Sequence, residues 1–280
     1  MVVNQLKTIV LLGLLTALLL FVGQLLGGYS GLVIAGIFAV ILNFGSYWFS
    51  DKIVLAMYRA KEVKDTNHHL YKIVKEVAEK ADVPMPMVYI IPDQNSNAFA
   101  TGRSPKKAAV AATEGIMNLL TDEELRGVIA HEIAHVKNRD TLISTIAGTI
   151  AGVISYIATM AQWAAIFGGR DREGNNNIFS LLLLAIVTPI VATIIQLAIS
   201  RSREFLADAS GAKIAGNGEH LATALEKLHK DVKAHPMRLG NQATSHLFIV
   251  NPFSGRALAN LFSTHPDMNS RVQRLRSMKF

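Results

Sequence analysis

The chain has 280 residues, half of them hydrophobic, and its mean hydropathy of +0.30 is too high for an ordinary soluble domain. It contains no cysteine, which excludes disulfide scaffolds, cysteine-ligated zinc and thiol catalysis. The formal net charge is +7, but no basic run is interleaved with aromatic residues, so we expect no nucleic acid partner.

Two apolar stretches open the chain. Residues 9–26 and 32–49 each approach the roughly 20 residues that cross a bilayer, and the glycine-rich segment 27–31 joins them in a short turn. We therefore expect residues 1–50 to form a transmembrane hairpin of two spans. A cleavable signal peptide is the alternative for the first stretch, but a second span that follows at once disfavours it.

Residues 51–140 have the pattern of a soluble α+β segment. Apolar residues at helical spacing predict an amphipathic helix over residues 66–81. Short β-branched or apolar stretches predict strands over residues 83–91, 98–101 and 108–113, with a polar turn at 102–107. Thr121 and Glu124 have the spacing of a capping box, which predicts that another helix begins there.

This last helix carries the sequence His-Glu-x-x-His at residues 131–135. Two histidines four residues apart lie on one face of a helix, so the imidazoles of His131 and His135 can reach one metal ion. Glu132 lies near the same edge, where it would act as the general base for an attacking water, as in zinc proteases. The same five residues also occur on solvated helices that bind no metal.

A second apolar pair follows the motif. Residues 143–167 and 178–199 are long enough to span a bilayer, and residues 168–177 form a short polar connector, so we expect residues 141–200 to form a second hairpin. Lysine and arginine gather at the ends away from the two hairpin turns, which predicts that both chain termini and the histidine motif face the cytoplasm. Charged residues directly after the motif favour a site beside the membrane, the rival being a site inside it.

Residues 201–280 would complete a catalytic domain begun by residues 51–140. Glu204 and Asp208 are four residues apart and share a helical face, so Glu204 is a candidate third metal ligand. Asp208 would then accept a hydrogen bond from a ligand histidine and fix its tautomer. The alternative is a salt-bridged helix surface with Arg201 and Arg203, which the pair alone would favour. Residues 271–280 form a basic end that could lie on the membrane surface.

The two motifs together resemble the peptidase family of the heat-shock membrane protease HtpX and the CAAX prenyl proteases. Three further segments resemble that family: Asn-Ala-Phe-Ala-Thr-Gly at residues 97–102, Thr-Glu-Gly at 113–115, and Ser-Thr-His-Pro at 263–266 with Arg271 beyond it. The resemblance covers essentially the whole chain. It implies a multi-pass α-helical membrane protein whose mainly helical α+β catalytic domain is of the zincin type and carries a small β-sheet.

The resemblance also implies site roles. One Zn²⁺ per chain would be held by His131, His135 and Glu204, with Glu132 as the catalytic base. An edge strand containing Asn97, Ala98 and Phe99 would pair with the substrate backbone, the alternative being a plain buried strand. His265 would stabilise the oxyanion or make a structural hydrogen bond, and Arg271 would serve the same end or tie down the C-terminal segment. His246 is a further candidate for contact with the site.

By the same resemblance, the substrates would be unfolded or damaged membrane proteins, cut on the cytoplasmic side of the bacterial inner membrane as part of a stress response. A CAAX-type processing enzyme would share the chemistry and differ in substrate. A non-proteolytic metal-binding or transport protein would instead need ionisable groups within the spans, and none lies mid-span. No feature of the sequence indicates an oligomeric state.

Overall fold

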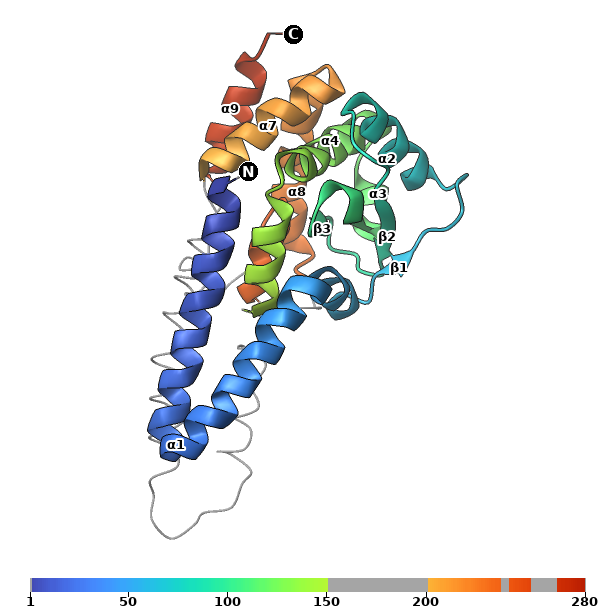
Figure 1. The fold of residues 1–280 in the computed structure, drawn as a ribbon. Helices are drawn as coiled ribbons and strands as arrows, with labels where there is room; N and C mark the ends of the chain where they lie inside the picture. The colour runs from blue at the N-terminus through green and yellow to red at the C-terminus, as the bar shows by residue number, and fades with distance from the viewer. Residues whose placement is uncertain (1, 151–200, 238–241, 253–265, 280) are drawn as a thin grey trace.

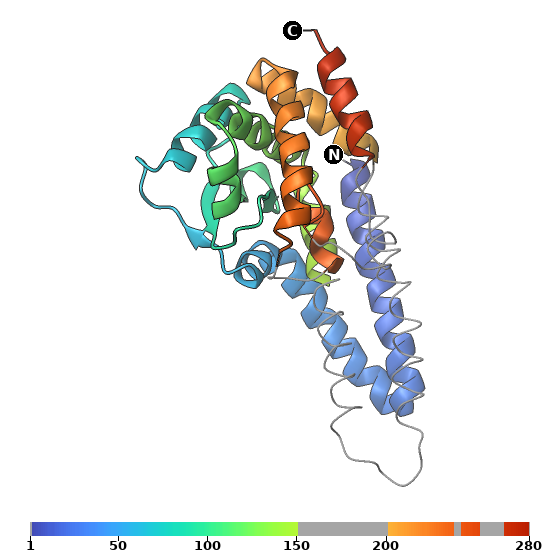
Figure 2. The same ribbon diagram turned by 180° about the vertical axis from the view of Figure 1, so that it is seen from behind.

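The computed structural model describes residues 2–150, 201–237, 242–252 and 266–279. A long helical hairpin projects from a body of helices and one small sheet (Figures 1 and 2). The described part is thus mainly helical with a small sheet, as the sequence predicts. The second predicted hairpin lies outside the described residues except for its first ten, which form helix Thr141–Ile150.

Helix α1 (Val2–Met57) consists of two arms that meet at two glycines. Gly27 and Gly28 leave helical geometry, and Gly28 has a φ of 55°, a conformation that glycine adopts without strain. The arms then approach closely, because a Cβ on Gly31 would lie 2.1 Å from the carbonyl oxygen of Gly23. The chain therefore folds back as a helical hairpin, while the crossing of a membrane by both arms stays a prediction. Among the described residues, the segment Gly27–Met57 is the helix that is long and apolar enough to cross a membrane, judged by length and composition.

Four strands form a mixed sheet in the order β1-β2-β4-β3. Strands β2 (Met87–Ile91) and β4 (Ala108–Thr113) are parallel, whereas β1 (Lys61–Glu62) and β3 (Ala98–Gly102) pair antiparallel with their neighbours. The three strands predicted from the sequence are confirmed. Strand β1 has two residues, which are too few for a sequence pattern to predict it. Strand β3 lies at an edge of the sheet, beside the helix that carries the histidine motif.

That helix, α4 (Asp122–Asn138), runs through the middle of the body (Figure 1). It packs against α2 (His69–Lys80) and the sheet, and also against α7 (Arg201–Ala215) and α8 (Gly218–Ala234). Short helix α3 (Glu114–Leu119) precedes it, and the 3₁₀ turns η1 (Pro105–Lys107) and η2 (Gln242–Leu247) lie in connections. The two segments predicted to form one catalytic domain thus contact each other, while their boundaries stay a prediction.

Helix α9 (Met268–Ser277) corrects the expectation of a basic end on the membrane surface. It packs on α8 and buries Val272 and Leu275, so its apolar face is covered by protein. One turn after Val272, Arg276 forms ion pairs with Glu219 and Glu226 of α8. Helix α9 therefore belongs to the folded body.

Candidate metal centre

Helices α4 and α7 bring the predicted ligands together. Thr121 caps the first turn of α4, and the Glu124 side chain accepts from the Thr121 backbone N–H, so the predicted capping box is present. One residue then sets how closely the two helices approach. A Cβ on Gly211 of α7 would lie 2.8 Å from the Cα and backbone nitrogen of His131, so only glycine permits this contact.

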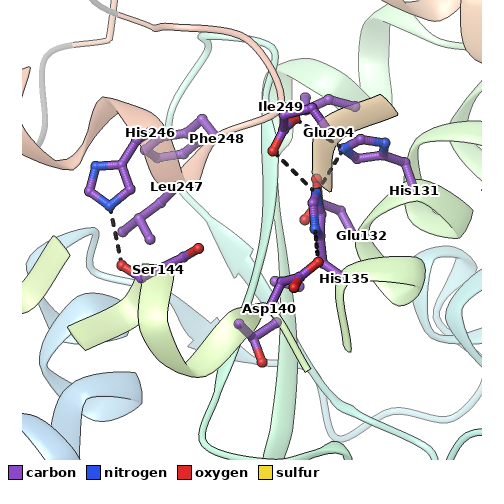
Figure 3. A pocket seen from close by; sticks show the side chains of 12 residues that line it. His131, Glu132, His135, Asp140, Ser144, Glu204, His246, Leu247, Phe248 and Ile249 are labelled. Carbon is purple, nitrogen blue, oxygen red and sulfur yellow. Dashed lines mark hydrogen bonds and ion pairs between the residues drawn. The ribbon is translucent and has the colours of Figure 1, made fainter. Parts of the chain in front are cut away.

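The three candidate ligand atoms form a compact triangle (Figure 3). The Nε2 atoms of His131 and His135 lie 3.2 Å apart. One carboxylate oxygen of Glu204 lies 3.8 Å from the first of these atoms, and the other lies 3.6 Å from the second. A tetrahedral zinc ion with bonds of about 2.0–2.1 Å separates its ligand atoms by about 3.3–3.4 Å. These spacings, which involve both carboxylate oxygens of Glu204, are close to those between the ligand atoms of such an ion.

The Nδ1 atom of each imidazole, on the side away from the triangle, lies near a different carboxylate. Nδ1 of His131 lies 3.0 Å from Oδ1 of Asp208, the contact predicted for that residue. Asp208 is in turn clamped by Arg271, whose Nε and terminal NH2 lie 2.9 and 2.7 Å from its two oxygens. A further donor of Arg271 binds the carbonyl oxygen of Ile249. Of the two roles open for Arg271, this geometry matches the structural one.

The second carboxylate is Asp140, whose Oδ2 lies 3.4 Å from Nδ1 of His135. The end of α4 places it there. Arg139 adopts a left-handed conformation with a φ of 59°, which folds the chain back so that the Asp140 backbone N–H donates to the carbonyl of His135. The other carboxylate oxygen lies 3.8 Å from Arg203 of α7. Asp140 is not among the site residues expected from the sequence, so its contact with a ligand was missed.

The buried charges around the triangle do not cancel. Four carboxylates are nearly inaccessible to solvent: Glu132, Asp140, Glu204 and Asp208. Two guanidinium groups oppose them, Arg271 fully buried and Arg203 largely buried. With both imidazoles neutral and all four carboxylates ionised, two negative charges are left in a region of low dielectric, where uncompensated charge is unfavourable. A divalent cation bound by His131, His135 and Glu204 would neutralise them, so the residues present fit such an ion.

The same burial shifts the ionisation of the central groups. Burial raises the pKa of Glu132 to about 8, and the neighbouring charge of Glu204 acts in the same direction. For His131, burial lowers the pKa and outweighs the opposing effect of Asp208. For His135, burial also lowers the pKa, but Asp140 and Glu204 outweigh it and raise the value to about 9. Without a cation the cluster therefore favours a proton on His135, which a metal would displace.

A narrow pocket opens at the triangle. Its volume of about 30 Å³ is room for an ion and a water but not for a peptide. Besides the ligands, its lining includes Glu132, Ala100 and His246, whose Nε2 lies 3.1 Å from the carbonyl oxygen of Ser144 (Figure 3). His246 is thus at the site, as expected. His265, the other histidine considered, lies outside the described residues.

Strand β3 passes this pocket. The residue that it contributes to the lining is Ala100, which is not one of the three residues predicted to contact the substrate. Asn97, Ala98 and Phe99 are all fully buried. The Asn97 carbonyl accepts from the Thr113 backbone N–H, and the Asn97 N–H donates to the Thr113 hydroxyl, so alternate residues from Asn97 onward face β4 and the residues between them face outward.

Each of the three outward positions has a partner on one of its backbone groups. The carbonyl of Ala98 accepts from the N–H of Ile249, and the carbonyl of Gly102 accepts from Thr141. Ala100 lies between them and lines the pocket, where its N–H donates to the carboxylate of Glu132. Ala100 is therefore the outward position that lines the pocket, whereas Asn97, Ala98 and Phe99 are buried, and their contact with a substrate stays a prediction.

Comparisons with known proteins agree with this geometry. The model of peptidase family M48 matches residues 64–279. A protein named "Protease HtpX homolog" from Desulforapulum autotrophicum is 55% identical over 98% of this chain and 89% of its own length. Another of that name from Thermodesulfovibrio yellowstonii is 56% identical over 98% of each chain. The crystal structure of S. mikatae Ste24p is 20% identical, with a TM-score of 0.46 over 94% of this chain and 65% of the other, a likeness too low to carry a conclusion.

Proposed function

The chain belongs to peptidase family M48 and is a metalloprotease, and from this premise we propose that it is a zinc endopeptidase of the inner membrane that cleaves misfolded or damaged membrane proteins. The observation that carries the proposal is the ligand triangle of His131, His135 and Glu204 beside a buried glutamate. Histidine and carboxylate ligands suit zinc, and three protein ligands leave a coordination position for the reaction.

Glu132 is the residue placed to move protons. When bound, zinc would polarise the scissile carbonyl and make water acidic enough to attack near neutral pH. The Glu132 carboxylate lines the pocket, and burial raises its pKa, so in its ionised form it is basic enough to accept a proton from the attacking water and can then return it to the leaving amine. Asp208 and Asp140 hold the two imidazoles so that each presents Nε2 to the ion.

The substrate would lie along β3. Because the pocket is too small for a peptide, we expect a chain to cross its mouth in extended form, with the outward carbonyl of Ala100 as the position for pairing with it. Backbone pairing selects for extended conformation and little for sequence. Folded proteins offer few such segments, so this arrangement favours unfolded or damaged chains.

The membrane placement is supported by the surface of the α1 hairpin. Large apolar side chains are exposed along both arms, among them Ile9, Leu14, Ile34, Val40 and Ile41. Exposed apolar area of this extent on a hairpin is typical of contact with lipid. The charge distribution along the chain supports a cytoplasmic position for the site.

A reconstituted system tests the substrate class. The protein would be placed in liposomes with zinc, together with a membrane protein in its stable form, a destabilised variant of it, and a prenylated C-terminal peptide. We expect cuts in the destabilised variant, on the side that carries the histidine motif, and far slower cleavage of the stable form. Exclusive cleavage of the prenylated peptide would contradict the proposal and favour a CAAX-type processing enzyme.

A further inference from the structure

The C-terminal part of α1 and the turn between β3 and β4 lie next to each other. Four aromatic residues lie near the end of the second arm, and four basic residues lie beside them or in the turn: Phe44, Tyr47, Trp48, Phe49, Lys52, Arg103, Lys106 and Lys107. We call these eight residues the aromatic–basic face. The metal site and the strand edge use none of them.

A direct contact joins the two segments, and two others lie within α1. The guanidinium carbon of Arg103 lies 4.3 Å from the ring centroid of Trp48, a cation–π contact between residues far apart in the sequence. Tyr47 meets the Trp48 ring edge-on at 5.4 Å, and the Lys52 ammonium lies 5.8 Å from the Phe49 ring. The turn is therefore attached to the hairpin.

The aromatic–basic face is exposed although it is largely apolar. Trp48 is 44% exposed and Phe44 is 59% exposed, and Lys52, Lys106 and Lys107 are also exposed. Between Phe44 and Lys52, the acidic residue of α1 is the partly buried Asp51, so positive charge dominates on the face. Aromatic rings beside lysine and arginine at the end of a span are the side chains that settle at the boundary between lipid and water.

We propose that the aromatic–basic face binds the headgroups of anionic phospholipids. The inference rests on the membrane placement proposed above. Lysine attracts a lipid phosphate as a point charge, arginine can bind it through two donors, and the rings fill the space between headgroups. Cytoplasmic leaflets carry anionic lipid, and that is the side on which the charge distribution puts the site.

Lipid at this face would also position the substrate edge. Arg103 follows Ala100 by three residues, and Gly102 between them is tied by its carbonyl to Thr141 at the start of the next apolar helix. Because β3 is held at this end by contacts with two apolar helices, a bilayer bound at the face places Ala100 close to the membrane surface. A chain emerging from the bilayer would meet the strand edge there.

Trp48 provides the signal for a test, because the chain has two tryptophans and the other is Trp163. The full-length protein with Trp163→Phe, in nonionic detergent, would be titrated with dioleoyl phosphatidylglycerol or with dioleoyl phosphatidylcholine. We expect a saturable change in Trp48 emission with the anionic lipid alone, at a midpoint that rises with salt. An equal response to phosphatidylcholine would overturn the proposal.

Two triple variants make the test specific. Lys52→Ala/Lys106→Ala/Lys107→Ala leaves the contact between Arg103 and Trp48 in place, and we expect it to weaken the apparent lipid affinity by about tenfold or more. The control Lys72→Ala/Lys75→Ala/Lys230→Ala removes the same number of exposed lysines from α2 and α8 and should stay within about twofold of the parent. Equal midpoints for the two variants would overturn the proposal.

Cleavage of the unfolded protein casein in the same samples separates this inference from the proposed function. A selective lipid response without any cleavage would contradict the endopeptidase and leave the face supported. Cleavage without a selective lipid response would support the endopeptidase and contradict the lipid proposal. If the first triple variant kept its lipid midpoint but had a raised KM for casein, which is acidic, the face would be a substrate site and the lipid proposal would be wrong.

Discussion

Substitution of Gly211 by alanine tests whether the approach of α4 and α7 sets the metal site. Gly211 lies two helical turns from Glu204, on the same face of α7. Its new Cβ would lie 2.8 Å from the Cα and nitrogen of His131. These are backbone atoms in the middle of a buried helix, so no side chain can rotate away to relieve the overlap.

The required displacement can be worked out from this contact. Non-bonded carbon atoms are optimally about 3.5 Å apart or more, so α7 and α4 must separate by roughly 0.7 Å. Metal–ligand distances are held within about 0.2 Å, and the shift would carry Glu204 away from both imidazoles by several times that margin. We expect the zinc affinity to fall on the order of tenfold to a hundredfold, with a loss of stability of about 1–3 kcal/mol from the overpacking.

Zinc affinity measured by competition with a chromogenic chelator checks the expectation. Gly127→Ala is the matched control, because its Cβ would lie 2.9 Å from the backbone nitrogen of Leu221, on the face of α4 that meets α8. The control should lose stability and keep its zinc affinity. Parent-like zinc affinity in Gly211→Ala, or equal losses of affinity in both variants, would refute the reasoning.

Three further predictions concern the groups behind the ligands. Asp140→Asn and Asp208→Asn should each lower zinc affinity by about tenfold to a hundredfold in the same competition assay. An unchanged zinc affinity in Asp140→Asn would show that Asp140 does not support the metal site. Because the pKa of His135 is raised to about 9, binding must displace a proton below that pH, so zinc affinity should rise by up to about tenfold per pH unit between about pH 6 and 9 and then level off; a flat profile would contradict this. Arg271→Met leaves buried Asp208 without its partner and should destabilise the protein by about 3–5 kcal/mol in thermal unfolding, whereas Arg276→Met at an exposed ion pair should change the midpoint little.

The parts of this fold that the sequence predicts are those with local causes. The capping box of Thr121 and Glu124 lies within one helical turn, and the histidine motif lies within two. Strands β2, β3 and β4 follow from short apolar runs, and the break in α1 follows from two adjacent glycines. In each case the information is contained in a few consecutive residues.

The parts that the sequence does not predict depend on contacts between distant segments. Ile249 covers the outward edge of Ala98, which leaves Ala100 as the outward position of β3 at the pocket. Arg271 is fully buried because Asp208, on another helix, accepts two of its donors. Asp140 is the exception, since it follows His135 by five residues, and a carboxylate just past the end of a ligand helix is a signal that could have been used.

The central claim is that Glu132 acts as the base beside a zinc ion held by His131, His135 and Glu204. The most direct test measures bound zinc and casein hydrolysis together in the parent, in Glu132→Gln and in Glu204→Gln. We predict about one zinc per chain and no hydrolysis for Glu132→Gln, and loss of both for Glu204→Gln. Hydrolysis by Glu132→Gln at the parent rate, or full zinc occupancy with parent-like affinity in Glu204→Gln, would contradict the account.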